Sequence, residues 1–198
     1  FDDRVTGNLD TYARQAKVIH FGIDPSEINK NVRADVAVVG DCKQTLVRVT
    51  ELLAEQKHTE WVDGFKPYRQ EEEQKGILPA IQPSEGPLLM GEVVRRVSEA
   101  THDSAIMVTD VGQNQLFGCR YFRFSQGRSI VTPGGCGTMG FGLPAAIGAT
   151  FGAPERTVCL FVGDGGLQMT IQELGTIMEQ RAPVKIILLN NNFLGNVR

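Results

Sequence analysis

The feature that most constrains this chain is a pair of apolar runs, each followed directly by a short polar motif. Residues 157–162 precede a Gly-Asp-Gly triplet centred on Asp164, and residues 184–189 precede an asparagine pair that ends at Asn191. Between them, residues 171–178 carry apolar side chains at helical spacing. This order predicts a strand, a helix and a parallel strand, whose two strand ends lie at the same edge of a sheet. We therefore expect Asp164 and Asn191, 27 positions apart, to meet at one site.

The chemistry of these two side chains indicates what the site binds. One carboxylate and one amide oxygen are too few protein ligands for calcium, but they suit magnesium, which keeps water and binds phosphate oxygens. Gly165 and Gly166 let the backbone approach a phosphate, and the next helix adds N–H donors at its N-terminus. The motif predicts a magnesium–diphosphate site. A tight turn and a turn-forming asparagine pair remain the simpler alternative.

A second motif is the glycine-rich segment 132–149. Five glycines lie between positions 134 and 142, more than helix or strand preference explains. They predict backbone that passes close to a ligand and then a helix of small residues packed on a sheet. A glycine-rich turn before a close-packed helix would explain Gly142 but not Gly134, Gly135 and Gly137 ahead of it.

Together these motifs resemble the acetohydroxyacid synthase (acetolactate synthase) large, or catalytic, subunit, a family of thiamine diphosphate enzymes. Four segments carry the resemblance: residues 1–7, 110–115, 134–149 and 163–198. The likeness covers nearly the whole chain and is weakest across residues 55–86.

The resemblance implies a cofactor site. Magnesium would be bound by Asp164, Asn191 and the backbone carbonyl of Phe193. Diphosphate contacts would come from Gly112, Gln113, Asn114, Gly165, Gly166, Leu194 and Gly195. The family usually has histidine where this chain has Asn114, which cannot titrate near neutrality. Gly137 and Met139 would be the catalytic contacts to the aminopyrimidine ring, with Met139 bending the cofactor; a core-filling role for Met139 is the alternative.

The resemblance also implies FAD, bound near the N-terminus by Arg4, Asp24 and Asp41. Asp24 and Asp41 each follow an apolar run, where turn and helix-cap chemistry explains them equally well. The family commonly has aspartate where this chain has Gly22, so the sequence supports FAD less strongly than thiamine diphosphate.

The predicted fold class is α/β with doubly wound parallel sheets. Residues 1–54 would end a Rossmann-like, FAD-type middle domain, and residues 55–87 would form a surface helix and a proline-containing linker. Residues 88–198 would form most of a thiamine diphosphate-binding domain. The family's subunits are about three times longer, so we expect the chain to be a fragment.

The implied activity is carboligation of 2-keto acids: two pyruvates give 2-acetolactate and CO2, or pyruvate joins 2-ketobutyrate, in branched-chain amino acid biosynthesis. A sister decarboxylase, pyruvate oxidase or glyoxylate carboligase is the alternative, as is a cofactor-binding piece without turnover. In the family a partner subunit supplies the glutamate that activates the cofactor, so at least a homodimer is implied, with a possible regulatory small subunit.

Composition sets further limits on function. The net charge is −3 and no basic run indicates nucleic acid. No apolar stretch reaches membrane-spanning length. Four widely spaced cysteines indicate free thiols and a cytoplasmic location.

Overall fold

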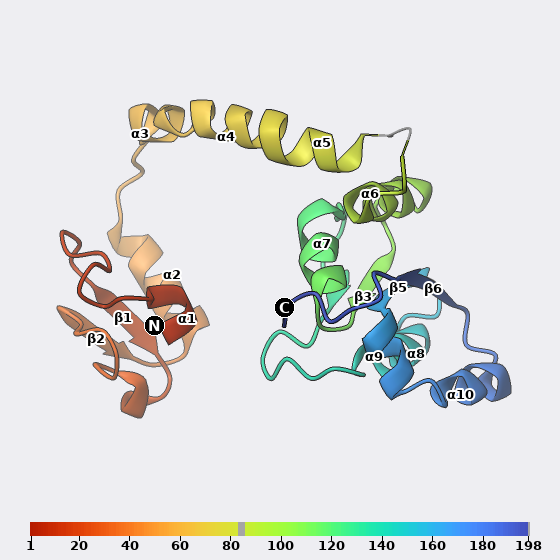
Figure 1. Ribbon diagram of the computed structural model, residues 1–198. Helices are drawn as coiled ribbons and strands as arrows, with labels where there is room; N and C mark the ends of the chain where they lie inside the picture. Colours follow the sequence, from red (N-terminus) through yellow and green to blue (C-terminus); the bar gives the residue numbers. More distant parts are fainter. Residues whose placement is uncertain (83–85, 198) are drawn as a thin grey trace. The chain divides into compact units, whose positions relative to one another are not determined.

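A computed structural model describes residues 1–82 and 86–197 of the chain (Figure 1). The chain divides into two compact units, Phe1–Trp61 and Val62–Arg198. Residues 83–85 of the predicted linker, and Arg198 at the end of the resembling segment, lie outside the described residues. The boundaries predicted at residues 54 and 88 are those of evolutionary domains. Compact units need not coincide with such domains, so these boundaries stay predictions.

Unit 1 is built on two parallel strands, in which Ile19 pairs with Val36 and Gly22 with Val39. Its elements are α1 (Asp3–Thr6), β1 (Ile19–Gly22), the 3-10 helix η1 (Pro25–Glu27), β2 (Val36–Val39), α2 (Cys42–Leu52) and α3 (Thr59–Gly64), which crosses into unit 2. Both strands fall within the apolar runs that precede Asp24 and Asp41 in the sequence.

Aspartates begin the two elements that follow these strands. Asp24 accepts a hydrogen bond from the Ser26 backbone N–H at 2.8 Å, and Asp41 accepts one from Gln44 at 3.1 Å. These contacts satisfy N–H groups that have no partner inside the helix. Turn and helix-cap chemistry, one of the two interpretations of these aspartates, is therefore observed, and nucleotide contact stays a prediction.

Unit 2 is a three-layer α/β structure around a four-stranded parallel sheet with strand order β4-β3-β5-β6. Its strands are β3 (Ile106–Thr109), β4 (Ile130–Val131), β5 (Val158–Gly163) and β6 (Val184–Leu189). Its helices are α4 (Lys66–Glu72), the π-helical η2 (Glu73–Ile77), α5 (Leu78–Ile81), α6 (Met90–Ala100), α7 (Gln113–Tyr121), α8 (Gly142–Gly152), α9 (Asp164–Met169) and α10 (Glu173–Gln180). The predicted α/β class with parallel sheets is confirmed.

Alternating side chains of the central strands fill two cores, one on each face of the sheet. Met107, Cys159 and Phe161 pack with residues of α6 and α7. Val108 and Leu160 pack on the opposite face with residues of α8. The strands are buried on both faces because helices cover both, which is why they appear in the sequence as continuous apolar runs.

The helical segment before α6 continues further than its prolines suggested. Pro79 lies in the first turn of α5, where a missing N–H costs little. Ile77, Ala80 and Ile81 pack against the core beside α6. The expected surface helix is therefore partly buried, and helix replaces the extended linker as far as Ile81.

The connection between β5 and β6 contains two short helices rather than the single helix expected over 171–178. Helix α9 ends at Met169, and the Thr170 hydroxyl then donates to the backbone carbonyl of Gly140 at 3.1 Å. This contact fixes the turn between α9 and α10 to the glycine-rich segment. Hydrophobic spacing carries no signal for such a tertiary contact.

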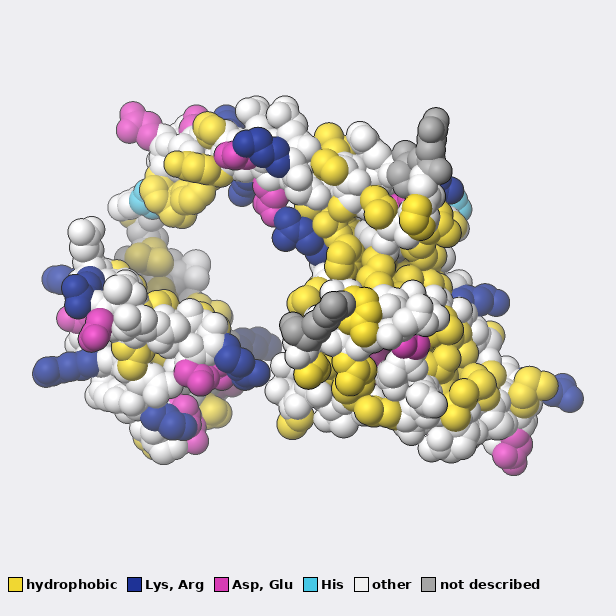
Figure 2. Space-filling view, viewed as in Figure 1, with side chains coloured by type: hydrophobic (Ala, Val, Ile, Leu, Met, Phe, Trp, Pro, Cys, Tyr) yellow, Lys and Arg dark blue, Asp and Glu magenta, His cyan; other side chains and the backbone are white. Residues whose placement is uncertain are grey.

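Apolar side chains also reach the surface of unit 2. Ile186 and Leu188 on the edge strand β6 are exposed, as is Met178 on α10. Figure 2 shows hydrophobic side chains gathered on the visible face of this unit. Among the described residues, no helix has both the length and the apolar character needed to cross a lipid bilayer.

The close packing of α5, α6 and α7 yields a stability prediction. A methyl group added at Gly91 would lie 2.7 Å from the Ala80 carbonyl oxygen and 3.1 Å from the Tyr121 ring. Gly91→Ala should therefore lower the free energy of unfolding by about 1–3 kcal/mol, despite alanine's better helix propensity. Urea unfolding measures this.

Gly148→Ala is the matched control, because Gly148 is also helical but has nothing within 4 Å of the added methyl group. It should be neutral or stabilising by up to about 1 kcal/mol. Equal effects of the two substitutions would contradict the packing account.

Candidate functional site

The candidate site lies where neighbouring strands of unit 2 end and the connections leave in opposite directions. The chain goes from β3 to β4 on one side, and β5 lies on the other side of β3. Such a switch point is where open parallel sheets bind ligands, at the carboxyl ends of the strands. Across β5 and β6, Gly163 pairs with Leu189, so Asp164 and Asn191 follow paired positions.

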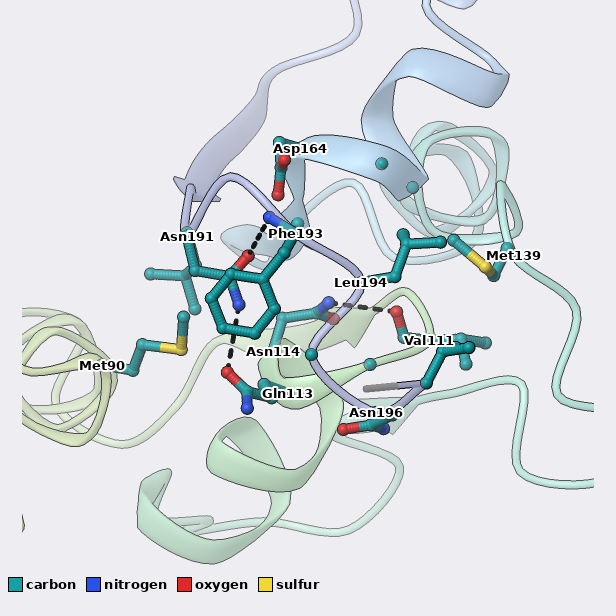
Figure 3. A pocket seen from close by; sticks show the side chains of 17 residues that line it. Met90, Val111, Gln113, Asn114, Met139, Asp164, Asn191, Phe193, Leu194 and Asn196 are labelled. Carbon is teal, nitrogen blue, oxygen red and sulfur yellow. Dashed lines mark hydrogen bonds between the residues drawn. The ribbon is translucent and has the colours of Figure 1, made fainter.

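One pocket brings together most of the residues predicted to bind the cofactor (Figure 3). The predicted residues that line it are Gly112, Gln113, Asn114, Met139, Asp164, Gly165, Gly166, Asn191, Phe193, Leu194 and Gly195. Gly137 does not line it; this residue has φ +62° and donates its N–H to the Pro133 carbonyl at 3.0 Å. Met90, Val111, Asn196 and Val197 line the pocket but were not predicted as site residues.

The loop after β6 is held by the side chain of Asn191. Its Oδ1 accepts from the Phe193 N–H at 3.2 Å, and its Nδ2 donates to Oε1 of Gln113 at 3.1 Å. Figure 3 shows the oxygen of this carboxamide on the side of Asp164 and the nitrogen on the side of Gln113. The structure thus brings together the two residues that the sequence placed at one site.

The N-terminus of α7 forms another wall of the pocket. Gly112 begins this helix with φ +128°, a conformation that favours glycine, and no side chain caps the first turn. The first N–H groups of a helix have no internal acceptor and carry partial positive charge, so they favour an anion.

Asn114 is buried in this first turn, at 4% exposure. Its Nδ2 donates to the Val111 carbonyl at 3.2 Å, whereas its Oδ1 has no hydrogen-bond partner among the described residues. A primary amide has a second N–H, so Asn114 retains one donor for a ligand.

Met139 lines another wall of the pocket, beside Gly165. Its Cε would lie 3.7 Å from a methyl group added at Gly165, and Leu194 would lie 2.7 Å from the same position. Figure 3 shows Met139 beside Leu194 at the edge of the pocket. Met139 is half-buried and lines the pocket, so it is not enclosed core filler.

Asp110 organises the site, although the sequence singled it out only as part of a motif. This fully buried carboxylate accepts from the backbone N–H groups of Val111, Gly140 and Gly142 at 2.8, 3.2 and 2.7 Å. It therefore ties the end of β3 to the glycine-rich segment. Its place directly after an apolar run was the available signal.

The same carboxylate gives Gly166 a structural reason to be glycine. A methyl group there would lie 2.5 Å from Oδ1 of Asp110. Gly195 is similarly constrained, because a methyl group would lie 2.5 Å from Cδ of Gln113. These close approaches join α9 and the loop after β6 to the segment after β3.

The donor set of the pocket fits magnesium and a diphosphate. Within the described parts of the chain, no three His, Cys, Asp or Glu side chains form a metal-binding group. Asp164 with Asn191 instead offers one carboxylate and one amide oxygen, beside helix N–H groups. Such a partial set suits a cation that keeps water and phosphate ligands.

The residues predicted to bind FAD lie in unit 1. Asp24 and Asp41 follow the carboxyl ends of the paired strands β1 and β2. Arg4 donates from Nε to Asp2 at 2.9 Å, and this hydrogen bond holds the pKa of Asp2 below its usual range.

Glu173, a carboxylate on α10, lies outside the pocket of unit 2 and accepts from the Thr176 hydroxyl at 2.8 Å.

Comparison with known proteins covers both units. Residues 110–198 match the C-terminal TPP-binding domain of thiamine pyrophosphate enzymes, and residues 1–49 match their central domain. The predicted order, a middle domain before a cofactor-binding domain, is confirmed.

Curated relatives match over the whole chain. The acetolactate synthase large subunit of Parasynechococcus marenigrum is 43% identical over 203 residues, covering 100% of this chain and 32% of that protein. The isozyme 3 large subunit of Escherichia coli is 40% identical over 201 residues, covering 100% and 35%. Acetolactate synthase 1, chloroplastic, of Nicotiana tabacum is 42% identical over 199 residues, covering 100% and 30%. The chain spans about a third of the length of these relatives.

The hydrogen bonds of Asp110 yield a second prediction. Asp110→Asn replaces one acceptor oxygen by an NH2 group that faces backbone N–H donors. We expect the free energy of unfolding to fall by about 1–3 kcal/mol, because a buried donor loses its partner. Urea unfolding measures the loss.

Asp41→Asn is the control, since Asp41 is an exposed N-cap and asparagine caps equally well. It should change stability by a few tenths of a kcal/mol, about the difference between two good caps. If Asp110→Asn were as mild, Asp110 would not organise the site.

Proposed function

We propose that the intact protein is an acetolactate synthase. The chain itself belongs to the thiamine pyrophosphate enzymes. The intact protein would join two pyruvates to 2-acetolactate with release of CO2, or pyruvate to 2-ketobutyrate, in branched-chain amino acid biosynthesis. The observation that carries this proposal is the pocket in which Asp164, Asn191 and the N-terminus of α7 converge. The choice of acetolactate synthase among these enzymes rests on the named relatives.

In this proposal, magnesium is bound by Asp164, the Oδ1 of Asn191 and the carbonyl of Phe193. The first two come from the ends of adjacent strands, and Phe193 follows two residues after Asn191. Because this set leaves coordination positions open, phosphate oxygens and water would complete the shell. Among the described residues that line the pocket, Asp164 is the one with a carboxylate, so its removal would leave the cation without that ligand.

The diphosphate would be bound by backbone rather than by basic side chains. The pocket lining contains no lysine, arginine or histidine among the described residues. N–H groups of Gly112, Gln113 and Asn114 at the start of α7 would donate to phosphate oxygens, together with Gly165, Gly166, Leu194 and Gly195. The magnesium ion would neutralise the remaining charge.

The glycine-rich segment would hold the organic part of the cofactor. Met139 would support the bend between the two rings, and Gly137 would offer its carbonyl to the aminopyrimidine. When bound, thiamine diphosphate supplies the carbanion-stabilising chemistry, and the protein supplies orientation and exclusion of water. Asp110 keeps Gly140, next to Met139, in place through a buried hydrogen bond.

FAD is the less supported part of the proposal. Asp24 and Asp41 lie at the strand edge where nucleotides bind in such sheets, but both carboxylates already cap backbone N–H groups. A side chain at Gly22 would make only ordinary contacts, at 3.7 Å or more, so glycine there is not sterically required. The visible absorbance of the purified intact protein tests whether flavin is bound.

The subunit partners are proposed from the relatives' names. Two of them are large subunits, which supports a regulatory small subunit as a partner. We also propose a homo-oligomer that shares its active site between subunits, working in the cytoplasm.

The direct test is product formation from pyruvate by the intact protein, with and without thiamine diphosphate and magnesium. We expect 2-acetolactate only when both are present. Asp164→Ala should lower its formation by about 100-fold or more, because loss even of outer-shell partners costs about 10–100-fold in metal affinity.

Glu179→Ala is the control, as it removes an exposed carboxylate on α10 outside the pocket. Acetaldehyde or acetyl phosphate as product would keep the cofactor site but assign the protein to a sister activity. Activity independent of both cofactors would refute the proposal.

A further inference from the structure

We propose that Gln113 is a positioning residue that fixes which end of the Asn191 carboxamide faces the cation. This inference rests on the proposed magnesium site. It adds a role for Gln113 that is separate from any contact with the diphosphate.

The observation is the hydrogen bond from Nδ2 of Asn191 to Oε1 of Gln113, at 3.1 Å. It joins the loop after β6 to the first turn of α7, 78 positions apart in the sequence. Both side chains are half-buried and line the same pocket. With the nitrogen committed to Gln113, the oxygen of Asn191 lies on the side of Asp164 (Figure 3).

This orientation matters because the two ends of an amide differ in chemistry but hardly in shape. The oxygen can bind a cation, whereas the NH2 group can only donate hydrogen bonds. A rotation of 180° would present the NH2 group to the cation and abolish the ligand. The Phe193 N–H, which donates to Oδ1 at 3.2 Å, and the Gln113 acceptor on Nδ2 both favour the binding orientation. Gln113 does so from a side chain, as outer-shell partners do for other metal ligands.

Gln113 is itself confined, which makes it a suitable anchor. A methyl group at Gly195 would lie 2.5 Å from its Cδ, 2.7 Å from its Nε2 and 2.9 Å from its Cγ. The Gln113 side chain therefore packs directly on the backbone of Gly195. Its position at the start of α7 fixes the other end.

The test is the affinity of the intact protein for Mn2+, measured by electron paramagnetic resonance at saturating thiamine diphosphate. Saturation removes any change in cofactor affinity from the comparison. Gln113→Met keeps a side chain of similar length but removes the acceptor. We expect it to raise the dissociation constant for Mn2+ by about 10-fold or more.

Two further variants separate orientation from packing. Gln115→Met is the matched control, because Gln115 lies on the same helix but donates to Thr132 and does not line the pocket; its affinity for Mn2+ should equal that of the wild type. In an Asn191→Asp background either carboxylate oxygen can bind the cation. Gln113→Met should then cost less than about 3-fold, below the outer-shell range.

The outcomes distinguish this inference from the function on which it rests. If Asp164→Ala leaves the affinity for Mn2+ unchanged, the proposed metal site is wrong and the inference fails with it. If Asp164→Ala weakens binding but Gln113→Met behaves like Gln115→Met, the metal site stands and the positioning role is refuted. An equal loss for Gln113→Met in both backgrounds would also refute it.

Discussion

The parallel pairing of β5 with β6 is the constraint on which the site depends. Because Gly163 pairs with Leu189, the residues that follow each strand leave the sheet at the same edge. Asp164 then begins α9, and Asn191 lies in the loop after β6, where its side chain bonds to Gln113. A shift of this register by one residue would reverse the faces of every side chain in β6 and move Asn191 along the edge. The two cores, one on each face, oppose such a shift.

A second level of order comes from Asp110, which connects backbone segments rather than contacting the proposed ligand. Its three hydrogen bonds hold the end of β3 and the glycine-rich segment together, and Gly166 packs against its carboxylate. Glycine at 166 therefore has two compatible explanations: close approach to a phosphate, and close approach to a buried side chain. The structure supplies the second, which the sequence pattern alone could not distinguish from the first.

Elements fixed by local patterns were predictable, and those fixed by tertiary contacts were not. The strand over 184–189 was predicted at the observed bounds, because a short apolar run bounded by turn-forming residues is consistent with a buried strand. The break between α9 and α10 was missed, since it depends on the bond between Thr170 and Gly140. Eleven predicted site residues line the pocket, whereas Gly137 does not. The Gln113–Asn191 contact spans 78 positions, so no local pattern could reveal it.

The most direct test of the central claim is the binding of thiamine diphosphate to the intact protein, measured by calorimetry with magnesium and again with a metal chelator. If Asp164 and Asn191 form a magnesium anchor for the diphosphate, binding should weaken by about 100-fold or more without metal, since the pocket has no basic side chain among its described lining residues. Restoring magnesium should restore the affinity. Equal affinity with and without metal would contradict the account, because the diphosphate would then be held by other groups.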